Sequence, residues 1–221
     1  MENYTVKQRF SPPRVICYIL GIFFLSLGTA ASVKSMLGSG PVVSIPYAVN
    51  LITGISFGTL SFLWQCLMLL LQLIILRKVT IWLLLQLLSG FLFGYFNNVG
   101  LWIMGFFPDP TNIFFKLVFI AISSCVAGFG VWLYTQANVI NMPNEGAVKA
   151  LAEVLFKKPF HKVKIGFDVS CVAIGLLLSI IFLHSLGSVG LGTIIISVWL
   201  GSMIGVYERH WGEKIRAFLK R

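Results

Sequence analysis

The chain has 221 residues, of which 57% are hydrophobic and only 11% are charged. A water-soluble domain of this length carries about 25% charged residues, so the composition excludes an ordinary soluble fold and indicates an integral membrane protein. The 17 Lys and Arg residues outnumber the 7 Asp and Glu residues. Because neither a folded basic surface nor an aromatic-basic motif is visible, we attribute this excess to membrane topology and not to nucleic-acid binding.

Long stretches without any Asp, Glu, Lys or Arg run through the chain. They are 15–33, 35–76, 79–108, 117–144 and 169–207. A spanning helix needs about 20 apolar residues, and continuous apolar runs favour helices over the alternating strands of a membrane barrel. We therefore predict an all-α polytopic membrane protein with six transmembrane helices. The predicted spans are 15–34, 57–76, 79–99, 113–135, 167–184 and 190–207.

Two of these stretches are too long for a single ordinary span. The first part of 35–76, from 37 to 54, is interrupted by glycine and proline, which predicts a short or re-entrant helix before the second span. The stretch 169–207 is interrupted by Ser-Leu-Gly-Ser at 185–188, which predicts a tight hairpin. The segment 208–221 mixes basic and apolar residues, and we expect a basic amphipathic tail on the cytoplasmic membrane surface.

Basic residues are distributed unevenly between the two ends of the predicted spans. With a cytoplasmic N-terminus, 15 of the 17 fall on the cytoplasmic side, and only Lys34 and Lys116 fall outside. This distribution follows the positive-inside rule and predicts that both termini are cytoplasmic. The alternative is that the first apolar segment is a cleavable signal peptide, since basic residues precede it and small residues follow it. We favour a retained span because an internal repeat gives this segment a counterpart.

The two halves of the chain correspond when one is shifted by 102 residues. Gly28 then aligns with Gly130. Pro41 aligns with Pro143, and each proline opens a candidate short helix. The predicted repeats cover about 15–99 and 113–207 of a single membrane domain. Each repeat ends in a Gly-x-x-x-Gly motif, which permits close helix packing. The motif residues are Gly90, Gly94, Gly201 and Gly205.

Three spans per repeat is an odd number, so the second repeat is expected to lie inverted in the membrane. Inverted repeats with interrupted helices are the architecture of many secondary transporters, because they expose one site alternately to each side. Gene duplication also produces channels, scaffolds and enzyme subunits. These classes remain alternatives at this point.

The segments 37–47, 137–143 and 91–96 together resemble the bacterial YczE/YyaS-like membrane proteins, which are related in pattern to the YitT group. The resemblance covers nearly the whole chain. It implies a multi-pass protein of the bacterial plasma membrane and supplies no catalytic residues, because the family is largely uncharacterised. The chain departs from the pattern at Ile140, which replaces a glycine, and at Asn97, where an acidic residue is expected. A role in ion coupling at Asn97 is therefore not inferred.

Asp168 is the carboxylate that we place inside a span, where ionisable groups are the first functional candidates. We consider it as a proton or cation site, or as an interfacial residue beside Lys164 near the start of the fifth span. Gln65 is its approximate counterpart in the other half and could face the same cavity. The loops around the two prolines are further candidates, since half-helix N-termini and free carbonyls bind ions, although Gly-Pro is also ordinary turn chemistry. The pathway candidates in these loops are Gly38, Ser39, Gly40, Pro41, Asn141, Pro143 and Asn144.

The sequence favours a secondary transporter that moves a small solute or ion by alternating access. Two alternatives remain open: the solute-binding subunit of a vitamin-type uptake complex, and a non-transporting accessory membrane protein. No nucleotide-binding loop, zinc-protease helix or carboxylate pair is visible, so we expect no enzymatic activity. The cysteines form no C-x-x-C pair, and no cofactor or metal site is predicted. The expected partners are the lipid bilayer and a small solute or ion, and a second copy of the chain is a further candidate.

Overall fold

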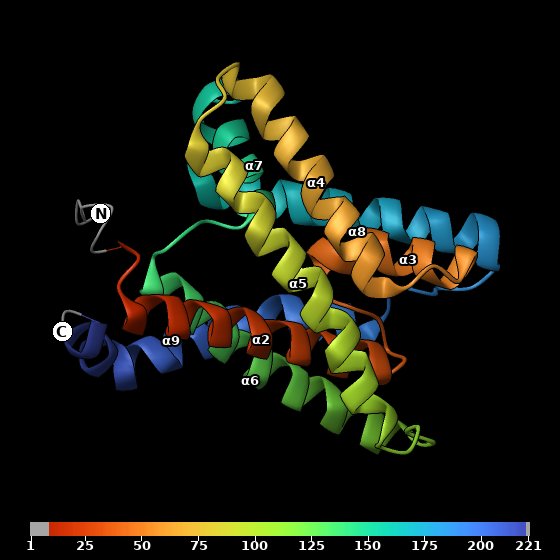
Figure 1. The fold of residues 1–221 in the computed structure, drawn as a ribbon. Helices are drawn as coiled ribbons and strands as arrows, with labels where there is room; N and C mark the ends of the chain where they lie inside the picture. Colours follow the sequence, from red (N-terminus) through yellow and green to blue (C-terminus); the bar gives the residue numbers. More distant parts are fainter. Residues whose placement is uncertain (1–8, 220–221) are drawn as a thin grey trace.

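The computed structural model describes residues 9–219, and the regular elements in this range are helices (Figure 1). The elements are α2 (Pro12–Lys34), η1 (Pro41–Val43), α3 (Ser44–Thr53), α4 (Phe57–Leu76), α5 (Ile81–Gly105), α6 (Ile113–Ala137), α7 (Pro143–Ala150), η2 (Leu151–Leu155), α8 (Phe160–Leu183) and α9 (Leu191–Leu219). The turn η1 is a 3-10 helix and η2 is a π-helical continuation of α7.

Six of these helices are long and apolar enough to cross a membrane: α2, α4, α5, α6, α8 and α9. The prediction of an all-helical protein with six spans is therefore confirmed. The short helices expected after the two prolines are also present, as η1 with α3 and as α7. Two helices extend well beyond the predicted spans: α8 begins at Phe160, before the span predicted from 167, and α9 continues to Leu219 through the segment predicted as an amphipathic tail.

Local sequence explains where several helices begin and end. Proline occupies the first turn of α2, η1 and α7, where its missing N–H is not needed. The Ser56 side chain accepts a hydrogen bond from Thr59 N and caps α4. Gly54, with φ of 72°, ends α3 in the left-handed conformation that glycine adopts without strain. These signals separate the short helices from the spans that follow them.

The centre of the fold is the antiparallel crossing of α2 with α6, beside which α5 and α9 pack (Figure 1). Glycine makes this crossing close. A Cβ built on Gly28 would lie 2.5 Å from Ala127 N, and a Cβ built on Gly130 would overlap Leu25. Close backbone approach of this kind is how membrane helices gain packing contacts where no water is available to drive association.

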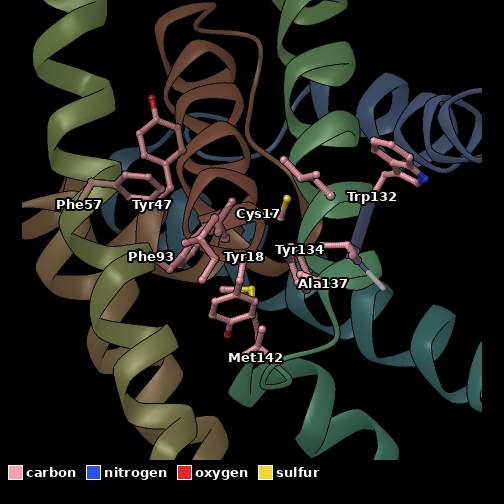
Figure 2. Packing of buried hydrophobic residues seen from close by; sticks show 14 residues of the cluster. Cys17, Tyr18, Tyr47, Phe57, Phe93, Trp132, Tyr134, Ala137 and Met142 are labelled. Atoms are coloured by element: carbon pink, nitrogen blue, oxygen red, sulfur yellow. The ribbon is translucent and has the colours of Figure 1, made fainter. Parts of the chain in front are cut away.

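A cluster of buried side chains surrounds this crossing (Figure 2). Tyr18 of α2 and Tyr134 of α6 meet edge to face, with ring centroids 6.3 Å apart. Tyr47 of α3 and Phe57 of α4 form a similar pair at 5.8 Å. Edge-to-face pairs of this kind add stabilisation beyond the burial of their area. The cluster thus ties the short helix α3 to the spans.

The two short helices pack against spans of the opposite half of the chain. In Figure 1, α3 lies alongside α8, and α7 lies beside α4. At the start of α3, the Ser44 hydroxyl donates to Cys171 O at 2.9 Å, near the middle of α8. Gly146 of α7 lies against the Gln72 side chain of α4. Each short helix therefore joins its own half of the chain to a span of the other half.

The C-terminal segment, expected as an amphipathic tail at 208–221, is helical through Leu219 and continues α9, and residues 220–221 lie outside the described range. Trp132 Nε1 and Gln136 Nε2 of α6 donate to Glu208 at 2.9 and 2.7 Å, and Leu219 is buried in the central cluster. These contacts hold one side of the segment against the spans.

Candidate functional site

The first turn of α7 lies deep among the helices. Its residue Asn144 donates its backbone N–H to Gln65 Oε1 at 3.2 Å, and Gln65 is 2% exposed near the middle of α4. Pro143 is fully buried, 3.7 Å from the position that a Cβ on Gly90 of α5 would occupy. Further along α7, Gly146 meets Gln72, which lies nearer the C-terminal end of α4. The helix α7 thus starts halfway along α4 and runs parallel to it.

Glu145 is the charged side chain of this turn. Its carboxylate accepts a hydrogen bond from the Tyr134 hydroxyl of α6, and Tyr134 is 3% exposed. Burial raises the pKa of Glu145 above its ordinary value of 4.5, although the Tyr134 hydrogen bond and the positive charge of Lys164 act in the opposite direction. A carboxylate in this position can take up a proton or hold a cation.

In the described part of the chain, two unpaired oxygen atoms lie at the first turn of α7, one on Asn144 and one on Gln72, which packs against Gly146. Gln72 is 5% exposed, and its Oε1 has no hydrogen-bond partner among the described residues. A Cβ built on Gly146 would overlap this oxygen, so the Gln72 amide points at the α7 backbone next to Glu145. Asn144 Oδ1 is also buried and unpaired within the same part of the chain. A buried acceptor without a donor is uncommon in proteins and calls for a partner.

Asp168 lies on α8 and forms an ion pair with Lys164 one turn earlier on the same helix. Because α8 begins at Phe160, Asp168 lies about two turns into this helix, beside Lys164. The structure gives Asp168 and Gln65 different partners: Gln65 binds the backbone of α7, whereas Asp168 binds Lys164. Gln65 and Asp168 therefore share no hydrogen bond, and no contact between them marks the common cavity that the sequence suggested.

The loop before η1 is bound to the hairpin between α8 and α9. Ser39 N donates to Ser188 O at 3.0 Å, and Gly192 N donates to Leu37 O at 2.9 Å. Gly38, with φ of 105°, lies against Gly190 and Thr193 in a position where a side chain would not fit. Of the remaining candidates, Gly40 caps η1 at its N-terminal end and Pro41 opens it. The loop is therefore closed against the hairpin.

The loop before α7 is less enclosed. Asn141 is exposed, whereas its neighbour Met142 is 2% exposed within the central cluster. Of the predicted residues, Pro143 and Asn144 meet Gln65 and Gly90 at the start of α7, while Asn141 faces outward. The structure thus brings Pro143 and Asn144 against α4 and α5.

The two Gly-x-x-x-Gly motifs differ in what they pack against. Gly90 lies against Gln65, and Gly94 lies against Gly58 and Phe62, so the first motif forms the α4–α5 contact. No heavy atom lies within 4 Å of a Cβ built on Gly201 or Gly205. The close packing expected for the second motif is absent within the described chain, because both glycines are on the outward face of α9.

Sequence reasoning missed Glu145 and Tyr134 as site residues. Glu145, Lys149 and Glu153 are spaced four residues apart, which fits one charged face of a helix and does not mark Glu145 as a site residue. The structure confirms the Lys149–Glu153 pair at 3.9 Å but turns Glu145 toward Tyr134. The sequence did contain one indication: Pro143 predicts the start of a short helix, and the first turn of a re-entrant helix, which here includes Glu145, is expected among the spans.

Comparison with known proteins shows the family. A protein-family profile described as "Family of unknown function (DUF6198)" matches residues 12–209, and the chain belongs to this family. Among curated proteins, the chain is similar to "Uncharacterized protein YyaS" of Bacillus subtilis (strain 168), with 28% identity over 205 residues, covering 90% of this chain and 96% of the relative. An "Uncharacterized protein" of Haemophilus influenzae is 25% identical over 187 residues, covering 84% and 79%. No solved structure matches the chain significantly.

Proposed function

We propose that the protein is a secondary transporter that moves a small solute or ion across the bacterial plasma membrane by alternating access. In this proposal both termini are cytoplasmic and the two halves of the chain act as inverted repeats. The observation that carries the proposal is the reciprocal placement of the short helices: α3 starts against the middle of α8, and α7 starts against the middle of α4. Interrupted helices that begin at mid-depth on both halves are the usual site-forming elements of such transporters.

The α2–α6 crossing supports the same proposal. Gly28 contacts Ala127, and Gly130 contacts Leu25. Adding 102 to the numbers of Gly28 and Leu25 gives Gly130 and Ala127, so the two contacts exchange under the predicted repeat. Contacts in which residue i meets j and the counterpart of j meets the counterpart of i are those of a two-fold axis. A two-fold axis between the halves is what alternating access by exchange of their conformations requires.

The contacts between helix ends are consistent with six alternating spans. Lys34 at the end of α2 pairs with Asp109 in the loop between α5 and α6, and the model of alternation places both on the outer side. Arg14 at the start of α2 donates to Ala137 O at 3.0 Å, and both belong to the inner side. Reporter fusions that place Lys34 and Arg14 on the same side would contradict this topology.

Cysteine accessibility tests the transport proposal directly. In a variant that lacks the native cysteines, Ser39→Cys and Asn141→Cys are labelled with a membrane-impermeant maleimide in right-side-out and inside-out vesicles. We expect Asn141→Cys to react from the cytoplasmic side and Ser39→Cys to react from the outer side in at least one condition of pH or ion gradient. Ile22→Cys, at a position that is 0% exposed, is the unreactive control.

The outcomes separate the functional classes. Reactivity that changes with conditions and occurs from both sides supports a transporter. Reactivity from the outer side alone, in every condition, supports a solute-binding subunit instead. If both loops stay sealed from both sides while exposed Met36→Cys is labelled, the chain is an accessory protein and the transport proposal fails.

A further inference from the structure

We infer that the first turn of α7 and the facing side of α4 form a binding site for a monovalent cation, either a proton or an alkali ion such as Na⁺, with Glu145 as its carboxylate. The inference rests on the proposed function, because the bound cation would be the ion that drives or accompanies transport. The site itself is defined by contacts that do not depend on transport.

The ligand atoms of this site are oxygens. Glu145 supplies a carboxylate, and Gln72 Oε1 and Asn144 Oδ1 are buried acceptors without donors among the described residues. Gln65 Oε1 accepts from the Asn144 backbone and retains a second lone pair. Carboxylate and carbonyl oxygens are the ligands that hard cations prefer. The N-terminus of α7 by itself would suit an anion, but the side chains gathered there are acceptors.

The Gln72 amide is the observation that distinguishes this turn from an ordinary helix start. Its side chain is 5% exposed, lies against Gly146, and leaves Oε1 unpaired. Only a glycine at 146 allows the amide to come this close to the α7 backbone. An unsatisfied buried acceptor is destabilising, and a cation or a protonated carboxyl nearby would remove that penalty.

The charges around Glu145 favour a single positive charge. On α8, Lys164 and Asp168 form an ion pair, and on α7 and η2, Lys149 and Glu153 form another. The Tyr134 phenol of α6 donates to Glu145, the Tyr18 phenol of α2 packs edge to face on Tyr134, and the buried Arg14 of α2 donates to Ala137 O. The α4 residues that contact the first turn of α7 are the neutral amides Gln65 and Gln72. Lys164, whose charge also acts on Glu145, is shared with Asp168, so a proton or a monovalent ion would complete the neutralisation of Glu145.

Thermal unfolding of the purified full chain tests the site. The melting temperature, Tm, is measured in sodium chloride and in choline chloride of equal ionic strength, at acid and at alkaline pH. For a sodium site we expect sodium to raise Tm by roughly 3–6 °C at about ten times its Kd, at alkaline pH only, because protons compete at acid pH. Glu145→Gln should abolish the rise, and Glu153→Gln, which alters an exposed carboxylate about two turns later in η2, should retain it.

The outcomes show whether Glu145 forms a cation site and whether the cation is an alkali ion or a proton. A sodium-dependent Tm that needs Glu145 identifies an alkali ion; no sodium effect, but a pH dependence of Tm that Glu145→Gln removes, identifies a proton. If neither effect depends on Glu145, the inference is wrong. Because Glu145→Gln could fail to fold, binding of radioactive sodium to the wild-type protein and to Gln72→Met, and the infrared carboxyl signal of the wild type, provide independent readouts. Absence of both the sodium binding and a protonated carboxyl in the wild type overturns the inference whatever the transport assays show.

Discussion

The Tyr134 hydroxyl donates a hydrogen bond to the Glu145 carboxylate and thereby joins the last turn of α6 to the first turn of α7. The two residues bracket the loop 138–142, whose Met142 is buried in the central cluster. A movement of α7 relative to α4 must either break this bond or carry the end of α6 with it. The protonation of Glu145 and the position of α7 are therefore linked.

Tyr134→Phe should change how stability depends on pH. Burial raises the pKa of Glu145 and the Tyr134 hydrogen bond lowers it, so the variant should have a still higher pKa in the folded protein. A carboxyl with a raised folded pKa is fully stabilising below its unfolded pKa, and stability is lost as pH rises through the folded value. The fall in Tm should therefore be larger in Tyr134→Phe and extend to higher pH. Tyr95→Phe, at an exposed position, should leave the wild-type pH profile unchanged, and an identical profile in Tyr134→Phe would contradict the link.

Glycine at the α2–α6 crossing should not tolerate a methyl group. Gly28→Ala and Gly130→Ala each place a Cβ within 3 Å of backbone on the other helix, so we expect each to cost about 1–3 kcal/mol through overpacking. Gly201→Ala and Gly205→Ala are the matched controls, because they lie on a spanning helix with no atom within 4 Å of the new Cβ. Thermal unfolding in detergent measures the difference. Equal Tm values for all four variants would mean that the crossing is looser than described.

The C-terminal end of α9 should contribute to stability through one side chain and not its neighbour. Leu219 is 4% exposed and packs in the central cluster, whereas Phe218 is 48% exposed. Leu219→Ala should lower the free energy of unfolding by about 2–3 kcal/mol, and Phe218→Ala should lower it by less than about 1 kcal/mol. Denaturation of the two variants in the same detergent checks this. A larger loss for Phe218→Ala would show that Phe218, and not Leu219, makes the stabilising contacts of this segment.

Asp168→Asn should have a small effect on stability. The residue pairs with Lys164 across one turn of its own helix, and about a quarter of each side chain is exposed, 28% in both cases. Partly exposed pairs at this spacing contribute about 1 kcal/mol or less. We expect Tm to change by no more than about 4 °C. A much larger loss would show that Asp168 supports more than its ion pair.

The sequence was sufficient to predict the spans because their signal is local. The predicted span 57–76 coincides with α4, and proline at 41 and 143 correctly indicated the short helices. The sequence did not predict that the segment after 207 contacts α6, where Glu208 accepts hydrogen bonds from Trp132 and Gln136. Hydropathy describes what a segment can be buried in, and not which partner it finds.

The candidate site was predicted only in part. Gln65 and Asn144 were identified separately, and the structure joins them by a hydrogen bond. The spacing of Glu145, Lys149 and Glu153 places them on one face of a helix, but helical spacing does not say which face points inward. Which face points inward depends on the crossing of α7 with α4, and that crossing rests on Gly146 and Gln72, two residues distant in sequence. Tertiary contacts of this kind leave no periodic signal in one sequence.

The bonds between the Ser39 loop and the α8–α9 hairpin have a mechanical consequence. Two backbone hydrogen bonds, from Ser39 N to Ser188 O and from Gly192 N to Leu37 O, hold the loop and the hairpin together at this end of the molecule. Water or a solute that enters between α3 and α9 from this end must first separate both bonds and move Gly38 from its left-handed conformation. In the proposed transporter, opening toward this side would therefore require that these two hydrogen bonds break.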